Sequence, residues 1–248
     1  MPSTQQEKAG LRDRPFSVLL GRLLFILSGV LPLLALALPD PDAMVLIWSV
    51  FVIVWLLRRP LARILSPLPA FTALIILFLF SGLITEVLAW GSTVWRGGDT
   101  PVVFHPQLGV DLTIAIGFYG GLGLGWALLA RFFRFTLIET VLCAGIYGIL
   151  VEQDGMVLLQ ILQTLPRNLP LALLLGAYVF LVYGAFTGIA FAPLAPIQGR
   201  RSHHWVRFVL VLPVSYVMAN LGVISVLAIW ELFGGLPDAR SALTHPIW

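Results

Sequence analysis

Long apolar runs separated by short polar segments make up most of the chain. A helix needs roughly 20 residues to cross the hydrocarbon core of a bilayer, and most of the runs reach that length. We therefore predict an all-α, polytopic membrane bundle with seven transmembrane helices. Their expected ranges are 16–38, 43–57, 70–92, 108–130, 135–151, 169–191 and 208–232.

The second and fifth runs are short, at fifteen and seventeen residues. Local thinning of the bilayer, or tilt of neighbouring helices, can accommodate them. Residues 1–15 form a polar tail, and the loops are too short for a soluble domain, so we expect a single transmembrane domain over 1–248. A cleaved signal peptide is the alternative for the first run. That run is too long for a normal signal sequence, so we expect it to be retained.

The composition agrees with a membrane protein. Hydrophobic residues make up 59% of the chain and charged residues 11%, whereas a soluble domain is about a quarter charged. The mean hydropathy is +0.96. A water-soluble core of this size could not bury so much apolar surface, so the surplus is expected to face lipid.

Basic residues are sorted to one side of the predicted spans, which predicts a cytoplasmic N-terminus and an external C-terminus. Twelve fall on segments that would be cytoplasmic, and three fall on the opposite side. The twelve are Lys8, Arg12, Arg14, Arg22, Arg58, Arg59, Arg63, Arg131, Arg134, Arg200, Arg201 and Arg207, and the three are Arg96, Arg167 and Arg240.

Only one basic residue, Lys8, is a lysine. Together with abundant Ala, Leu and Gly, this bias favours a GC-rich prokaryotic gene, and hence a multi-pass protein of a bacterial plasma membrane. A retinal Schiff base is excluded, because it needs a lysine within a span.

Small residues recur at helical spacing in two spans. Gly117, Gly121 and Gly125 lie four residues apart on one face of the fourth span, and Gly184 and Gly188 form a similar pair in the sixth. Small residues let helix backbones approach closely in lipid. We expect the fourth span to be central and closely packed, with the sixth as its candidate partner.

Three other residues bear on helix packing. Asn220 lies near the middle of the last predicted span, where an amide is expected to bond across a helix interface. Pro32 and Pro213 lie within predicted spans and are candidates to kink their helices.

Glu86 is the most informative ionisable residue, because it lies six residues inside the predicted end of the third span. Burial in lipid disfavours a carboxylate unless a cation or strong donors compensate. Arg96 and His105 are the nearby candidates for structural pairing. The alternative is that Glu86 belongs to a site for a proton, an ion or a substrate.

Glu152 and Glu231 lie near the outer ends of the fifth and seventh spans. Helix C-termini carry partial negative charge, so acids there would favour protons or cations. With Glu86 they would form an acidic mouth, although glutamates near an interface can also simply reach water. Glu139, near the start of the fifth span, is electrostatically favoured there, so we expect a structural role for it.

Two further residues are catalytic candidates beside Glu86. Asp111 lies at the beginning of the fourth span and is expected to cap that helix. His105 lies in the preceding loop, and with Glu86 and Asp111 it could complete a metal site. No helical metal-ligand spacing supports one, so we expect no metal.

The sequence contains no nucleophile motif, P-loop or dinucleotide fingerprint, so it names no cofactor. We expect the bilayer, and other membrane subunits, as partners, and no nucleic acid. The first hypothesis is a non-catalytic accessory, assembly or scaffold subunit of a membrane complex. The second is an intramembrane enzyme on a lipid or isoprenoid with Glu86 as acid or base. The third is a small proton- or ion-coupled transporter, weakened by the absence of inverted repeats.

Overall fold

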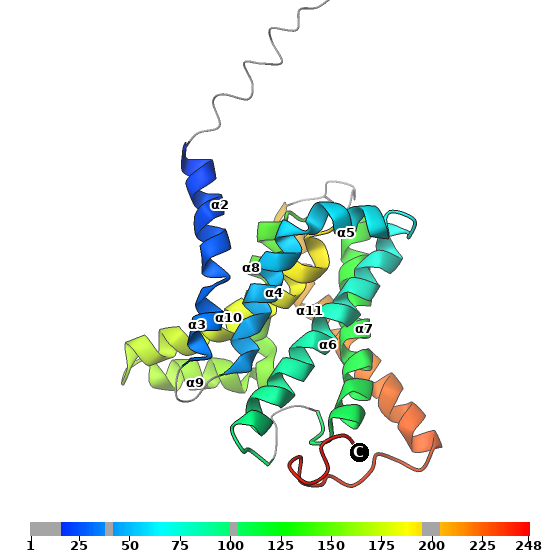
Figure 1. Cartoon of the computed structure of the whole chain (residues 1–248). Helices are drawn as coiled ribbons and strands as arrows, with labels where there is room; N and C mark the ends of the chain where they lie inside the picture. Colours follow the sequence, from blue (N-terminus) through cyan, green and yellow to red (C-terminus); the bar gives the residue numbers. More distant parts are fainter. Residues whose placement is uncertain (1–15, 38–41, 100–103, 195–203) are drawn as a thin grey trace, which may run out of the picture.

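The computed structural model describes residues 16–37, 42–99, 104–194 and 204–248, and these residues form helices and connecting loops without a strand (Figure 1). The expected polar tail, 1–15, lies outside the described residues. The elements are α2 (Phe16–Ser28), α3 (Leu31–Ala35), η1 (Ala43–Val45), α4 (Leu46–Leu56), α5 (Arg58–Leu65), α6 (Ala70–Trp95), α7 (Leu108–Phe132), α8 (Leu137–Val151), η2 (Glu152–Gly155), α9 (Met156–Thr164), α10 (Leu169–Phe191) and α11 (His204–Leu232).

Six stretches of helix in the described part of the chain are long and apolar enough to cross a membrane. The number becomes seven if η1 and α4 are counted with α5, from which they are bent by 73°. Many large apolar side chains on the outside of the bundle are exposed, among them Leu173 at 61% and Ile224 at 59%. An apolar outer surface of this kind is compatible with lipid as the surrounding solvent.

The first predicted span, 16–38, is two helices in the structure. Helix α2 ends at Ser28, and α3 begins at Leu31 with Pro32 in its first turn. A proline is tolerated there because its missing N–H would have no helical partner in any case. Pro213, by contrast, lies inside α11, which is assigned as one helix through it. Helix α2 stands apart from the bundle (Figure 1), and only 11% of residues 18–35 are buried.

Several helix ends differ from the predicted ranges. Helix α6 continues to Trp95 instead of ending at Ser92, and α11 begins at His204 instead of Phe208. Polar side chains near these ends are compatible with helix, so an apolar run marks the length of a span better than the length of its helix. Helix α8 begins later than predicted, at Leu137.

Aromatic side chains fill the centre of the bundle between α6, α7 and α10. Trp126 of α7 stacks on Phe78 of α6 with ring centroids 6.4 Å apart, and Phe186 of α10 meets Phe78 edge to face. All three side chains are at most 2% exposed. Helix α7 therefore contributes to the aromatic centre of the bundle.

The glycines of α7 face α11. A Cβ atom at Gly117 would overlap the backbone of Gly222, and one at Gly121 would overlap the carbonyl oxygen of Met218. At Gly125 it would lie 3.2 Å from the Met218 Cβ atom. The structure thus places α11 against this face, and not α10, the partner expected from sequence.

The glycines of α10 face other neighbours. Gly184 lies against Val141 of α8, and Gly188 lies against the ring of Phe51 in α4. Asn220 also differs from expectation, because its side-chain amide donates to the Tyr216 carbonyl oxygen of its own helix at 2.8 Å and is exposed. An exposed amide that bonds one turn back does not join two helices.

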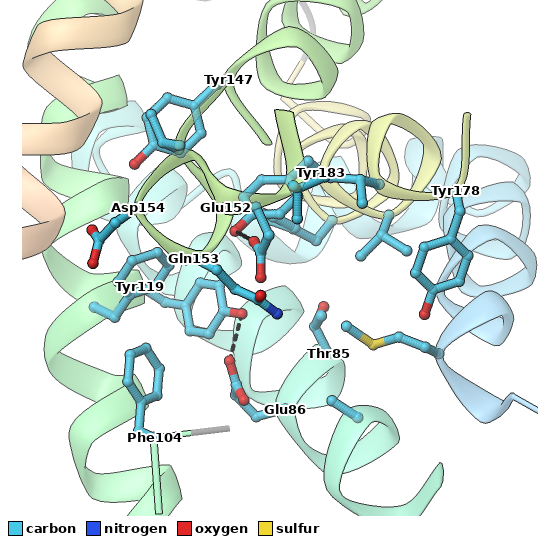
Figure 2. Close-up of a pocket in the computed structure, with 18 of the residues that line it drawn as sticks. Thr85, Glu86, Phe104, Tyr119, Tyr147, Glu152, Gln153, Asp154, Tyr178 and Tyr183 are labelled. Carbon is cyan, nitrogen blue, oxygen red and sulfur yellow. Dashed lines mark hydrogen bonds between the residues drawn. The ribbon is translucent and has the colours of Figure 1, made fainter. Parts of the chain in front are cut away.

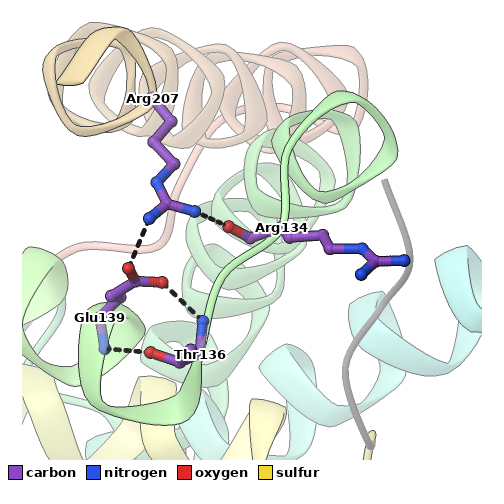
Figure 3. A network of polar contacts seen from close by, with 4 residues as sticks. All are labelled: Arg134, Thr136, Glu139 and Arg207. Atoms are coloured by element: carbon purple, nitrogen blue, oxygen red, sulfur yellow. Dashed lines mark hydrogen bonds and ion pairs between the residues drawn. The ribbon is translucent and has the colours of Figure 1, made fainter. Parts of the chain in front are cut away.

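A polar network joins the start of α8 to α11 (Figure 3). Thr136 and Glu139 form a reciprocal capping box, with the Thr136 N–H donating to Glu139 Oε2 at 2.7 Å. Arg207 of α11 pairs with Glu139 and donates to the Arg134 carbonyl oxygen. The structural role expected for Glu139 is confirmed, since one carboxylate both caps its helix and holds a second one.

The close α7–α11 contact predicts a sharp difference between two adjacent glycines. Gly121→Ala should lower the free energy of unfolding by about 1–3 kcal/mol, because the new methyl group meets backbone that cannot rotate away. Gly120→Ala is the matched control, since its Cβ atom would lie 3.6 Å from Leu79, an ordinary contact. Thermal unfolding of both variants in mild detergent measures the effect. Equal melting temperatures would contradict the close packing.

Candidate functional site

A cavity of about 590 Å³ lies among helices α6 to α11. It is lined by the C-terminal parts of α6 and α8 and by the middle of α10, and these parts of α6 and α8 lie toward the end of the bundle opposite α5 (Figure 1). All five tyrosines of the chain line it: Tyr119, Tyr147, Tyr178, Tyr183 and Tyr216. We call this space the tyrosine cavity.

The charged groups of the tyrosine cavity are mostly acidic. Four carboxyl side chains line it, Asp42, Glu86, Glu152 and Asp154, against one guanidinium, that of Arg96. In the described part of the chain none of these acids makes an ion pair, since the one ion pair found there joins Arg207 to Glu139. The lining therefore carries more negative than positive charge, and its one guanidinium is not paired with an acid in the described residues.

Glu86 is held by a tyrosine. The Tyr119 hydroxyl donates to Glu86 Oε1 at 2.8 Å, and Glu86 is 8% exposed (Figure 2). The ring of Tyr119 lies against Gly82, one turn before Glu86 on α6, where any side chain would overlap it. A glycine four residues before the acid thus makes room for the aromatic donor.

Glu152 is held in the same way. The Tyr183 hydroxyl donates to Glu152 Oε2 (Figure 2), and the Tyr183 ring lies against Gly148, four residues before the acid. Two separate helix pairs, α6 with α7 and α8 with α10, therefore use one local arrangement. In each, a Gly-x-x-x-Glu segment on one helix receives a tyrosine from the next.

Asp42 makes the third contact between a tyrosine and a carboxylate. Its Oδ2 atom accepts from the Tyr178 hydroxyl at 2.8 Å, and its Oδ1 atom accepts from Ser92 at 2.8 Å and from the Met44 N–H at 3.0 Å. The last bond caps η1. Asp42 thus connects α6, α10 and the start of α4 at the rim of the cavity.

The backbone between α8 and α9 is unusual. Gln153 and Asp154 have φ values of 50° and 55°, and Gly155 follows at 84°. Left-handed conformations are unfavourable for side chains other than glycine, and they cluster at functional sites. Gln153 and Asp154 both line the tyrosine cavity, so the break between α8 and α9 forms part of the cavity wall.

The structure brings together two of the three glutamates expected at an acidic mouth. Glu86 and Glu152 line the cavity, whereas Glu231 is exposed near the end of α11 and does not line it. The expected pairing of Glu86 with Arg96 or His105 is not found in the described residues. Its partner is the neutral hydroxyl of Tyr119.

His105 and Asp111 do not line the cavity, and they have other contacts. Asp111 Oδ1 accepts from the His105 backbone N–H at 3.1 Å, while the cap position of α7 is Gln107. Asp111 is therefore not the N-cap expected from sequence, but it holds the preceding loop from the first turn. The His105 ring lies 3.2 Å from the Pro237 carbonyl oxygen. The Gln107 side-chain amide donates to the Arg240 carbonyl oxygen at 2.8 Å.

These contacts fasten the C-terminal segment over the start of α7. They give His105 and Asp111 a structural use, and the Asp111 charge also lies near enough to act on Glu86. Within the described residues, no group of three or more His, Cys, Asp or Glu side chains is arranged to hold a metal ion.

The tyrosines are the site residues that sequence reasoning missed. Tyrosine in a membrane protein usually lies at the interface, near the ends of spans. Tyr119, Tyr183 and Tyr216 instead lie well inside their helices. Tyrosines in mid-span, together with two Gly-x-x-x-Glu segments, were the available signal.

Fold and cavity define a class: an all-helical protein with six or seven helices suited to crossing a membrane, and an internal polar cavity. No protein-family model matches the chain, and no curated protein or solved structure does so either. The arguments on function therefore depend on the cavity itself.

Removal of one hydroxyl tests the Glu86 contact. Tyr119→Phe should lower the free energy of unfolding by about 1–3 kcal/mol, because a buried carboxyl loses its donor while the ring stays in place. Tyr147→Phe is the matched control, because Tyr147 lines the same cavity and makes no hydrogen bond with other described residues. Chemical or thermal unfolding in detergent compares the two. An equal effect of both changes would show that the Tyr119 bond contributes nothing specific.

Proposed function

We propose that this chain is a membrane transporter that binds a small organic cation in the tyrosine cavity and exchanges it for protons. One observation carries the proposal: five tyrosines and four carboxyl groups line a single cavity with one guanidinium. Aromatic faces and carboxylates are the groups that recognise ammonium ligands. The volume of about 590 Å³ lies within the range of small-molecule sites, about 300–1,000 Å³.

The hydrogen bonds of Glu86 support exchange with protons. A tyrosine hydroxyl satisfies one carboxylate oxygen and leaves the negative charge uncompensated. In a buried site that charge has to be neutralised by a proton or by a bound cation. Glu86 can therefore hold one or the other, and this alternation is what couples proton movement to the movement of a cationic substrate.

The helix break beside Glu152 supports transport in a second way. Non-helical backbone at membrane depth is tolerated where it lines a polar cavity, and transporters place ion and substrate sites at such breaks. Here Gln153 and Asp154 interrupt the path from α8 to α9 and line the cavity. The C-terminal end of α8 also directs partial negative charge toward this place.

We propose seven spans, with the N-terminus in the cytoplasm and the C-terminus outside, in the plasma membrane of a bacterium. Supporting this orientation, α5, which carries Arg58, Arg59 and Arg63, lies at the opposite end of the bundle from α9 and the C-terminus (Figure 1). The positive-inside rule assigns the arginine-rich end to the cytoplasm. The tyrosine cavity then lies toward the outside.

The role of an accessory or scaffold subunit is the second candidate, and one observation favours it. Helix α2 is apolar, stands apart from the bundle and is largely unburied. A helix exposed in this way is suited to contact another membrane subunit. The enzyme hypothesis has less support, because neither His105 nor Asp111 lines the cavity that holds Glu86.

Binding of a charged probe tests the proposed function. Choline should bind to the purified chain, whereas its uncharged isostere 3,3-dimethylbutanol should bind at least about tenfold more weakly, because the attraction is to the positive charge. Glu86→Gln should reduce choline binding by a similar factor. Glu231→Gln is the matched control, since Glu231 lies outside the cavity. Isothermal titration calorimetry in detergent measures the binding of both probes to the wild-type chain and the binding of choline to the two variants.

Proteoliposomes then test the exchange. An outward proton gradient should drive accumulation of labelled choline by the wild-type chain and by Glu231→Gln, but not by Glu86→Gln. Equal binding of choline and 3,3-dimethylbutanol would contradict the proposal. Binding of choline without any gradient-driven uptake would reduce it to a cation-binding protein.

A further inference from the structure

A second cavity, of about 400 Å³, opens between α2, α4 and α8. We call it the α2 groove. Its lining is apolar and aromatic apart from one charged side chain, that of Arg22. It involves none of the residues of the tyrosine cavity and lies on another side of the bundle, where α2 diverges from the rest of the chain (Figure 1).

The floor of the groove is an interlocked aromatic cluster. Phe25 of α2 meets Trp48, Phe51 and Trp55 of α4 edge to face, with ring centroids 6.0, 5.5 and 5.0 Å apart. Trp48 also donates to the Ser28 hydroxyl at 2.9 Å. These contacts hold α2 against α4 on one side only and leave an apolar channel toward α8.

Arginines stand at one end of this channel. Arg22 lines it, and the Arg58 guanidinium lies 4.1 Å from the centre of the Trp55 ring, which also lines it. Arg59 and Arg22 lie close enough for their positive charges to reach Arg58. None of these three arginines makes an ion pair with an acid in the described residues. Arg22 in the lining and Arg58 on the Trp55 ring place positive charge beside an apolar channel, and this combination calls for an anion with an apolar tail.

The dimensions argue for a lipid rather than a helix. The residues of α2 that line the groove run from Val18 to Phe25, two helical turns or about 11 Å, whereas a packed transmembrane helix would use a longer face. At Gly21 the groove is open, with no other atom within 4 Å of the position of a Cβ atom. A flexible chain can fill such an opening.

We propose that the α2 groove binds one anionic phospholipid, with its phosphate at Arg22 and Arg58 and an acyl chain along the aromatic cluster. The lipid completes the packing of α2, which the protein alone leaves largely unburied. It also supplies the negative charge that the arginines lack. Phosphate is the shared feature of such lipids, and the acyl chain distinguishes them from free phosphate.

The experiment uses the full chain in mild detergent after removal of bound lipid. Phosphatidylglycerol and phosphatidylcholine with identical acyl chains are added separately, and bound lipid is counted by native mass spectrometry. One phosphatidylglycerol should bind and raise the melting temperature, while phosphatidylcholine and inorganic phosphate should do neither. Arg22→Gln and Arg58→Gln should each weaken binding about fivefold, as expected for one basic group at an anionic headgroup.

A third variant separates the contribution of the groove's shape from that of its positive charge. Gly21→Leu fills the channel and leaves every arginine in place, so it should also displace phosphatidylglycerol. Its control is Gly91→Leu, because Gly91 likewise has no atom within 4 Å of a Cβ position but lies on α6. Arg131→Gln, an exposed arginine on α7, controls for general charge loss.

Three results would overturn the proposal. The first is equal binding of the two lipids, and the second is a loss in Arg131→Gln as large as that in Arg22→Gln. The third is a dimer of the chain in the native spectrum that Gly21→Leu abolishes, which would assign the groove to a second copy. Loss of phosphatidylglycerol in Gly21→Leu alone among the glycine variants would support the lipid.

Discussion

The site depends on one constraint: a carboxylate inside a helix bundle needs a donor, and here the donor is an uncharged tyrosine. An arginine would satisfy the same oxygens and cancel the charge, and the Glu139–Arg207 pair is of this kind. Tyr119 provides the hydrogen bond to Glu86 and leaves the charge. The two glutamates therefore differ in the charge of their partners, since Glu139 has a cationic partner and Glu86 a neutral one. The charge of Glu139 is balanced by Arg207, whereas the hydrogen bond from Tyr119 brings no positive charge to Glu86.

Glycine makes these donors possible. A tyrosine can reach an acid on a neighbouring helix only if its ring has somewhere to lie, and Gly82 and Gly148 provide that space one turn before Glu86 and Glu152. The same residue type brings α7 and α11 into backbone contact at Gly121. Glycine therefore serves two purposes in this fold, since it allows close packing in one interface and accommodates aromatic rings in two others.

The helices and their apolar character could be predicted from sequence, because apolar runs of span length have few alternatives. The need of Glu86 for a partner could also be predicted, since an acid among Leu, Ile and Val is costly wherever the helix packs. Its partner was not, because choosing Tyr119 over Arg96 requires knowing how α6 and α7 are rotated toward each other. The prediction that Asn220 bonds across a helix interface was wrong for a similar reason. The sequence gives the depth of Asn220 along its helix but not the direction in which its side chain points.

The break after α8 shows how the parts of the site depend on one another. Continued as a straight helix, residues 153 and 154 would turn their side chains away from the face that Gly148 and Glu152 share. The left-handed turn at Gln153 and Asp154 stops the helix just after Glu152 instead, so that all three residues line the cavity and α9 closes one side of it. The cost of two unfavourable backbone conformations is about 1–3 kcal/mol each. A cost of that size is retained where the geometry it creates is used, and at this position it places a carboxyl, an amide and a second carboxyl in one cavity lined by every tyrosine of the chain.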